Sequence, residues 1–210
     1  MDFFTRIIFH FKETKIIIVT GERKSYASET IAEVLSSHFK VKKFIEKTPN
    51  IIDSLTNEIF VIEADLKNQA IFKKLVKMVK YSKLPILVVS KIGESAFEKI
   101  YKFSQLIPPY GFLILDFDDK KSREIDSITN LKNFTFGFEE GADFKASDLH
   151  INTGVNFKIN YKGKIIPIWQ EKFLGQEYIY SALAASCVGI VLGLNFVEIS
   201  ETLKHLKISK

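Results

Sequence analysis

Three residues in one short segment have side chains or backbone groups suited to phosphate binding: Gly21, Lys24 and Ser25. In a phosphate-binding loop, backbone N–H groups at a helix N-terminus face the anion, a lysine neutralises its charge and a hydroxyl binds Mg²⁺. The glycine expected directly before the lysine is missing, because Arg23 occupies that position, and the loop is short. Taken alone, the segment favours an ordinary strand-to-helix turn, with a degenerate Walker A loop as the alternative.

The segments on either side of this loop predict a strand and a helix. Lys15 leads into four consecutive β-branched residues at 16–19, which is typical of a parallel strand buried on both faces. Thr20 and Gly21 end this strand. From Ser25 onward the apolar residues recur at helical spacing, with Ser25 or Ser28 available as the N-cap.

The next part of the chain alternates between apolar strands and amphipathic helices. Strands are predicted at 41–45, 60–65, 85–92 and 111–119, helices at 68–83 and 95–107, and a polar connection at 46–58. This alternation predicts an α/β fold with a mostly parallel, doubly wound sheet. Ligands of such sheets bind at the carboxyl ends of the strands. The polar or conformationally special residues expected there are Gly21, Lys24, Glu63, Asp65, Lys91, Asp116 and Asp118.

The character of the sequence changes after residue 132. Apolar and polar residues alternate over 133–172 with turn signals between them, which predicts an added antiparallel β-hairpin region. Its tightest turn is expected at 161–164, and we interpret Trp169 as a packing residue. Helices are predicted at 177–194 and 196–207.

Length and composition predict one sizeable domain at 15–210, preceded by an N-terminal helical extension at 1–14. No apolar run is long enough to span a membrane, and a single Cys187 favours a reducing, cytoplasmic location. The net charge of +5 is compatible with nucleic acid. The lysines are nevertheless spread over the chain, and those at 68–83 describe a solvated helix face, so we expect no nucleic-acid partner. The four histidines lack metal-ligand spacing.

Several motifs in order resemble the central ATPase domain of Mur ligases. VTGERKS at 19–25 is similar to the family's Thr-Gly-x-x-Gly-Lys-Thr loop, and FVIEAD at 60–65 is similar to the strand with its magnesium-binding Glu. VVSKIGESAFE at 88–98, LILDFDD at 113–119 and the two C-terminal helices resemble later motifs. The resemblance covers residues 15–207. The sequence at 143–168 most resembles that of the ligase that adds D-alanyl-D-alanine to the UDP-N-acetylmuramoyl-tripeptide.

The resemblance implies a P-loop-type fold and ATP-dependent amide formation through an acyl phosphate. It implies ATP and magnesium as cofactors, with Gly21, Lys24 and Ser25 at the phosphates. Ser25 and Glu63 would hold magnesium, while Asp116 and Asp119 would lie near the base and ribose of the nucleotide.

The departures from the family pattern concentrate at the implied catalytic site. Ala96 replaces a magnesium-binding His, Phe103 replaces a lysine that is carbamylated in many members, and Lys91 replaces an Asn. Phe and Ala have no lone pair for a metal, so a second magnesium site is not expected. The changes around the implied adenine site are Gln176, Glu177 and Ser181. The family's N- and C-terminal domains are also expected to be absent.

Two functional hypotheses remain open. The first is a stand-alone, non-catalytic Mur ligase central domain, a pseudoenzyme that serves as a binding or scaffold protein in peptidoglycan synthesis. Its partner would be another Mur ligase or cell-wall enzyme. The alternative is an ATP-binding subunit of an amide-forming ligase, which would retain nucleotide through Gly21, Lys24, Ser25 and Glu63.

Overall fold

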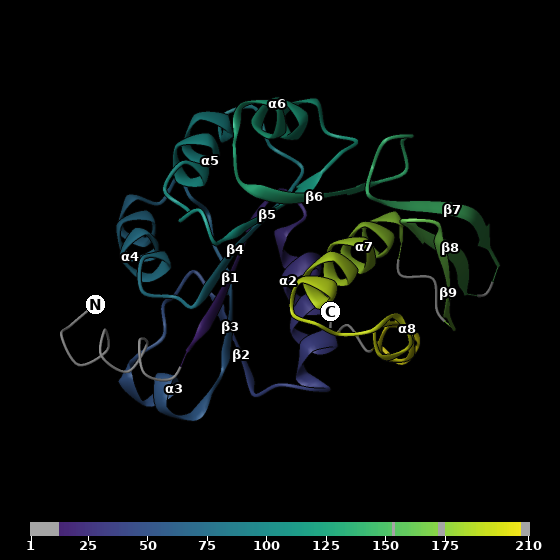
Figure 1. The fold of residues 1–210 in the computed structure, drawn as a ribbon, viewed down its shortest axis with the longest axis horizontal. Coiled ribbons are helices and arrows are strands. Elements are labelled where there is room, and N and C mark those ends of the chain that lie inside the picture. The colour runs from purple at the N-terminus through teal and green to yellow at the C-terminus, as the bar shows by residue number, and fades with distance from the viewer. Residues whose placement is uncertain (1–12, 153, 172–174, 207–210) are drawn as a thin grey trace.

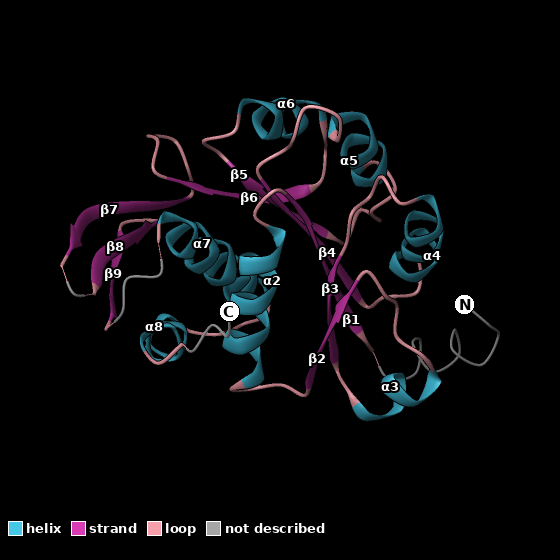
Figure 2. Ribbon diagram, turned by 180° about the vertical axis from the view of Figure 1, so that it is seen from behind, coloured by secondary structure: helices cyan, strands magenta, loops and turns pink. Residues whose placement is uncertain are grey.

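A computed structural model describes residues 13–152, 154–171 and 175–206. Within these ranges one nine-stranded sheet runs through the molecule in the order β2-β3-β1-β4-β5-β6-β7-β8-β9, with helices on both sides of its first part (Figures 1 and 2). The fold is the α/β, mostly parallel architecture that the sequence predicts.

The parallel part of the sheet consists of seven strands joined in parallel pairs, the last pair being β6 and β7. Alternate residues of these strands face two separate apolar layers, so that Ile17 and Val19 face one and Ile16 and Ile18 the other. The six strands that precede β7 are β1 (Lys15–Gly21), β2 (Val41–Ile45), β3 (Ile59–Glu63), β4 (Leu84–Ser90), β5 (Phe112–Asp116) and β6 (Lys132–Gly137).

The helices divide between the two faces of this sheet. On one face lie α2 (Lys24–Ser36) and the almost fully buried α7 (Gln176–Val191), which pack against each other. The other face is covered by α4 (Gln69–Val79), α5 (Phe97–Ser104) and α6 (Lys120–Ile128) (Figure 1). The short α3 (Ile51–Thr56) follows β2, and α8 (Phe196–Lys204) packs on β9.

The antiparallel part consists of β7 (Phe144–Ile151), β8 (Val155–Tyr161) and β9 (Lys164–Gln170). The two-residue turn between β8 and β9 has positive φ at Lys162 (47°) and Gly163 (75°), as a type I′ hairpin turn requires. The turn expected at 161–164 is confirmed.

Two expectations about elements are wrong, and one helix lies where the sequence analysis made no prediction. Residues 132–137 form β6, which is parallel to both β5 and β7, and not part of an antiparallel hairpin. Its sequence alternates because Phe134 and Phe136 face the apolar core, whereas Asn133 and Thr135 between them bond to Asp126 and Asp143. The helices α3 and α6 were not expected: α3 depends on a capping box between Asn50 and Asp53, and α6 buries little apolar surface besides Ile125.

The N-cap of α2 also differs from the expectation. Arg23 holds that position without a side-chain cap, because the hydroxyls of Ser25 and Ser28 bond elsewhere. The helical extension predicted at 1–14 lies almost entirely outside the described residues. Of the helices that the structure describes, none is long and apolar enough to cross a membrane.

Candidate functional site

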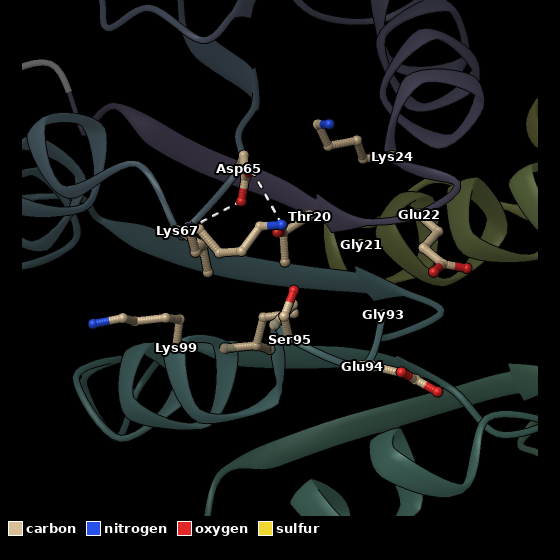
Figure 3. A pocket seen from close by; sticks show the side chains of 13 residues that line it. Thr20, Gly21, Glu22, Lys24, Asp65, Lys67, Gly93, Glu94, Ser95 and Lys99 are labelled. Atoms are coloured by element: carbon tan, nitrogen blue, oxygen red, sulfur yellow. Dashed lines mark hydrogen bonds and ion pairs between the residues drawn. The ribbon is translucent and has the colours of Figure 1, made fainter.

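The carboxyl ends of β1, β3 and β4 border a pocket of about 430 Å³. Lys24 borders it from the start of α2 and Lys99 from α5, with Asp65 and Lys67 between them (Figure 3). Its polar and charged lining residues are Thr20, Glu22, Lys24, Asp65, Lys67, Glu94, Ser95 and Lys99. The pocket lies where a doubly wound sheet places its ligands.

The loop between β1 and α2 is only two residues long, because β1 ends at Gly21 and α2 begins at Lys24. Gly21 has φ of 108°, and a Cβ there would lie 2.1 Å from the carbonyl oxygen of Ser90. The backbone N–H of Glu22 donates to the carbonyl of Lys91 at 2.9 Å, and that of Arg23 donates to the carbonyl of Ser90 at 3.4 Å. Both loop amides are therefore engaged by the end of β4 and do not face the pocket as a phosphate cradle requires.

Ser25 and Glu63, which are predicted to hold magnesium, are hydrogen-bonded to each other. The Ser25 hydroxyl donates to Oε1 of Glu63 at 2.6 Å, and the Ser28 hydroxyl donates to Oε2 at 2.9 Å. Glu63 is buried at the end of β3, so these two hydroxyls satisfy a carboxylate that would otherwise be costly to bury. Lys24 lies one residue away, and it forms no ion pair within the described ranges.

Arg23 points away from this pocket and binds residues from β5 and α7. Its Nη1 lies 2.9 Å from Oδ2 of Asp116, whose side chain is 1% exposed, and its guanidinium lies 3.9 Å from the ring centroid of Tyr180. Burial raises the pKa of Asp116 to about 7, and the positive charge of Arg23 opposes that rise. The Tyr180 hydroxyl donates to Asp118 at 2.7 Å, and burial together with this contact raises the pKa of Tyr180.

Asp119 is also engaged within the protein. It is the N-cap of α6, where Oδ2 accepts the N–H of Ser122 at 3.2 Å and its hydroxyl at 2.9 Å. The same oxygen accepts the N–H of Ile92 at 3.0 Å. Of the predicted site residues, Gly21 and Lys24 line the pocket. Ser25 and Glu63 bond to each other next to Lys24 without lining the pocket, and Asp116 and Asp119 bond elsewhere.

The sequence analysis missed two lysines and a serine of the pocket, Lys67, Lys99 and Ser95. Lys67 follows Asp65 after β3, where its N–H donates to that carboxylate at 2.9 Å, and Lys99 lies in the first turns of α5. Both lysines come after the carboxyl end of a strand in the sequence. That position could have indicated that they lie at the ligand-binding edge of the sheet. Lys91 ion-pairs with Glu22 at 2.9 Å, at the rim of the loop.

Comparison with known sequences shows that the chain is similar to UDP-N-acetylmuramate–L-alanine ligases. A UDP-N-acetylmuramate–L-alanine ligase from Alkaliphilus metalliredigens is 33% identical over 116 residues, which are 54% of this chain and 25% of that protein. A UDP-N-acetylmuramate–L-alanine ligase from Dictyoglomus turgidum is 28% identical over 215 residues, covering 93% of this chain and 44% of that protein. The chain is related to the Mur ligases. No family model matches the sequence.

Solved structures show that the fold is that of the Mur ligase central domain. MurF from Acinetobacter baumannii superposes with a TM-score of 0.76 at 18% identity, over 98% of this chain and 49% of that one. MurF from Thermotoga maritima in complex with ADP gives 0.73 at 18% identity, over 98% of this chain and 51% of that one. The chain spans less than half the length of the two sequence relatives above.

The site fits one of the two magnesium positions implied by the Mur ligase resemblance. A hydroxyl and a carboxylate, Ser25 and Glu63, are oxygen donors of the kind that Mg²⁺ prefers. At the second position Ala96 borders the pocket but has no atom that could bind a metal. Phe103 of α5 is fully buried in the protein core, where its ring meets that of Phe72. The described residues contain no group of three His, Cys, Asp or Glu side chains placed to hold a metal.

The three substituted residues at the implied adenine site divide between two environments. Gln176 and Glu177 line a small pocket of about 170 Å³ together with Arg23 and Tyr180. Ser181 is buried, and its hydroxyl donates to the backbone carbonyl of Glu177 at 2.8 Å. Ser181 thus bonds within its own helix instead of facing a ligand.

Proposed function

We propose that this domain is a non-catalytic Mur-ligase-type protein that acts as a binding or scaffold module in cytoplasmic peptidoglycan precursor synthesis. The observation that carries this proposal is the loop between β1 and α2. Its two amides donate to the carbonyls of Ser90, the last residue of β4, and Lys91, which follows it, and its arginine pairs with buried Asp116. The two loop amides that would face an ATP phosphate are therefore bonded inside the protein.

The implied metal chemistry supports the same proposal. Ser25 and Glu63 would hold one Mg²⁺, which would neutralise charge on bound phosphate. Ala96 and Phe103 supply no ligand for a second ion, so these two positions cannot provide its contribution to acyl-phosphate formation. We propose a Mur ligase or another cell-wall enzyme as the partner.

The subtype is a further part of the proposal. The sequence at 143–168, which forms most of the β7–β9 hairpins, most resembles that of the D-alanyl-D-alanine-adding ligase. The sequence relatives named above are instead L-alanine ligases. If the scaffold acts beside one Mur ligase, these two steps of precursor synthesis are the ones to test first.

The alternative function is an ATP-binding subunit of an amide-forming ligase. It is favoured by Lys24, which faces the pocket without an ion-pair partner in the described ranges, and by the Ser25–Glu63 pair. In this case the nucleotide would approach through the N-terminal amides of α2 rather than through the loop.

Titration calorimetry with ATP and ADP, each with and without Mg²⁺, separates the two functions. The non-catalytic proposal predicts no ATP hydrolysis and no binding tighter than about 1 mM, a free energy of roughly 4 kcal/mol. Lys24→Ala is compared with Lys74→Ala, which removes the same charge from the exposed face of α4. Binding lost only in Lys24→Ala would favour the alternative, and magnesium-dependent turnover lost in that variant would overturn the proposal.

A further inference from the structure

The pocket at the carboxyl ends of β1, β3 and β4 has a buried hydroxyl in its wall. Thr20 lines the pocket and is only 2% exposed, and the alternation along β1 places its side chain on the same face as Ile16 and Ile18. Its backbone carbonyl accepts the hydroxyl of Ser90 at 3.1 Å, but its own hydroxyl makes no hydrogen bond within the described residues. A buried hydroxyl is costly without a partner, so this group is suited to bind a ligand in the pocket.

Three lysines from separate elements border the same pocket. Lys24 comes from the start of α2, Lys67 from the loop between β3 and α4, and Lys99 from α5 (Figure 3). In the part of the chain that the structure describes, only Lys67 has a carboxylate at ion-pair distance, that of Asp65 at 3.9 Å. Both side chains of that pair are exposed to solvent, so the pair is weak. Lys24 and Lys99 therefore offer positive charge that no described carboxylate pairs with.

Lys99 lies close to the position where the Mur ligase resemblance implies a second magnesium ion. Ala96, at the position of the implied metal-binding histidine, lines the pocket, and Lys99 follows it by three residues. Residues three apart at the start of a helix project from the same side, which agrees with both of them lining the pocket. A fixed ammonium group attracts an anion as a bound cation does. The pocket can consequently bind an anion without Mg²⁺.

Hydrogen-bond acceptors lie on the other side of the pocket. Glu22 and Glu94 are on the side away from Lys99 in Figure 3. Glu22 is paired with Lys91 at 2.9 Å, whereas Glu94 forms no ion pair with any described residue. Glu94 and the neighbouring Ser95 hydroxyl are free to accept hydrogen bonds from hydroxyl groups of a ligand. Acceptors opposite a group of cations suit a molecule that is anionic at one end and hydroxylated at the other.

We propose that this pocket binds a small sugar phosphate, a phosphate monoester of a polyhydroxylated molecule, without magnesium. The phosphate accepts hydrogen bonds from the three ammonium groups and from the Thr20 hydroxyl, and the sugar hydroxyls donate to Glu94 and Ser95. Lysine binds phosphate as a point charge, whereas arginine is the better match for a planar carboxylate. Each cation that lines the described pocket is a lysine.

Charge and size disfavour a nucleoside triphosphate as the ligand of this pocket. The lining contains as many carboxylates as lysines, namely Glu22, Asp65 and Glu94 against Lys24, Lys67 and Lys99. A metal-free triphosphate would bring several negative charges beside those carboxylates, whereas a phosphate monoester brings at most two. The volume of about 430 Å³ is also in the lower part of the range for ligand pockets. The inference gives the proposed binding module a ligand and rests on the proposed function only in that ATP does not occupy the pocket.

Titration calorimetry of the full chain in buffer with EDTA tests the ligand class. The probes are glucose 6-phosphate and glucose 1-phosphate, with glucose, gluconate and inorganic phosphate as separate arms. We expect at least one sugar phosphate to bind with a Kd below about 1 mM and about tenfold more tightly than gluconate or inorganic phosphate. Glucose should give no binding heat, because it lacks the anion. Replacing EDTA by Mg²⁺ should change the affinity by less than about twofold, since the lysines supply the charge.

Two matched pairs of variants show whether this pocket is the binding site. Lys99→Gln removes a lysine of the pocket, and Lys102→Gln removes an exposed lysine of the same helix that does not line it. We expect a loss of affinity of about tenfold or more for the first and less than about twofold for the second. Thr20→Val removes the buried hydroxyl with little change of shape and should also cost about tenfold, whereas Thr20→Ser keeps a hydroxyl and should retain most of the affinity. Circular dichroism checks that each variant is folded.

Four results would overturn the inference. They are no binding of either sugar phosphate, binding of inorganic phosphate or gluconate as tight as that of the sugar phosphates, binding that requires Mg²⁺, and equal losses for Lys99→Gln and Lys102→Gln. None of them involves ATP or a change of Lys24, so the proposed function would stand. Magnesium-dependent ATP turnover lost in Lys24→Ala would instead overturn the proposed function, and it is measured without any sugar phosphate.

Discussion

Arg23 and Asp116 show what a single substitution can do to a phosphate-binding loop. Arg23 occupies the position where the loop motif has glycine, and its side chain crosses to β5 to pair with Asp116 at 2.9 Å. The ring of Tyr180 covers the other side of the guanidinium at 3.9 Å. An arginine with a planar, delocalised charge suits both contacts at once. The residue that removes the loop glycine thereby also anchors the loop to the core.

At this scale the structure predicts an unusual pH dependence of stability. The pKa of Asp116 is about 7 in the folded protein, whereas an unfolded aspartate titrates near its ordinary value. The folded state therefore binds the proton more tightly, and this group stabilises the fold most fully at acidic pH. The contribution is lost as pH rises through about 7, by roughly 2–3 kcal/mol between pH about 5 and about 7.5.

Urea unfolding of the wild type and of Asp116→Asn at several pH values measures this contribution. We expect the wild type to lose stability more steeply than the variant across that interval. The absolute stability of the variant also changes, because Arg23 loses its carboxylate, but only the difference in slope reports the titration. Parallel curves would show that Asp116 does not titrate there.

The element that decides the site is the junction of β1 with β4. Gly21 pairs with Ser90 in the parallel ladder, so β1 continues through the position where a phosphate loop would begin to curve away. This pairing requires both the φ of 108° and the missing Cβ of Gly21. The short loop is thus a consequence of the extended strand. Together they direct the amides of Glu22 and Arg23 to the carbonyls of Lys91 and Ser90.

Two glycine variants separate conformational strain from steric overlap at this junction. Gly21→Ala would place a Cβ 2.1 Å from the Ser90 carbonyl oxygen, whereas Gly163→Ala, also at positive φ, meets nothing within 4 Å. We expect a loss of more than about 3 kcal/mol in unfolding free energy for Gly21→Ala and about 1 kcal/mol for Gly163→Ala. Equal losses in thermal or urea unfolding would mean that the β1–β4 contact is not close.

At the scale of the whole molecule the antiparallel hairpins and the parallel sheet share one core. The same apolar cluster contains Ile17 and Val88 from the parallel strands and Phe144, Phe157 and Ile168 from the hairpins. Helix α7 contacts β4, β5, β6 and β7, so it connects both parts. Elements that bury a common apolar surface are expected to unfold together.

Phe144→Ala tests this shared core. The ring of Phe144 stacks on Tyr161 with 4.1 Å between ring centroids and meets Phe134 edge-on at 5.6 Å. We expect a loss of about 3–5 kcal/mol, observed as one cooperative transition shifted to lower temperature in calorimetry. Leu149→Ala, on the exposed part of β7, is the control and should change stability by less than about 0.5 kcal/mol. A separate early transition in Phe144→Ala would show that the hairpins unfold independently.

The sequence by itself determined the elements whose signals are local. Four β-branched residues define β1, helical spacing of apolar residues defines α4, and Lys162 with Gly163 marks the hairpin turn. It also indicated the Mur ligase relationship, because the motifs that carry the resemblance lie at strand ends. Each of these signals is contained in a few neighbouring residues.

Only the tertiary structure decided how distant segments meet. The parallel pairing of β6, the bond from Arg23 to Asp116 across 93 positions and the bond from Tyr180 to Asp118 across 62 positions depend on the order of strands in the sheet. So does the exposure of Trp169, which follows from the place of β9 at the end of that sheet. Partners in a sheet are chosen by burial and backbone hydrogen bonding over the whole chain, and a local pattern carries no record of that choice.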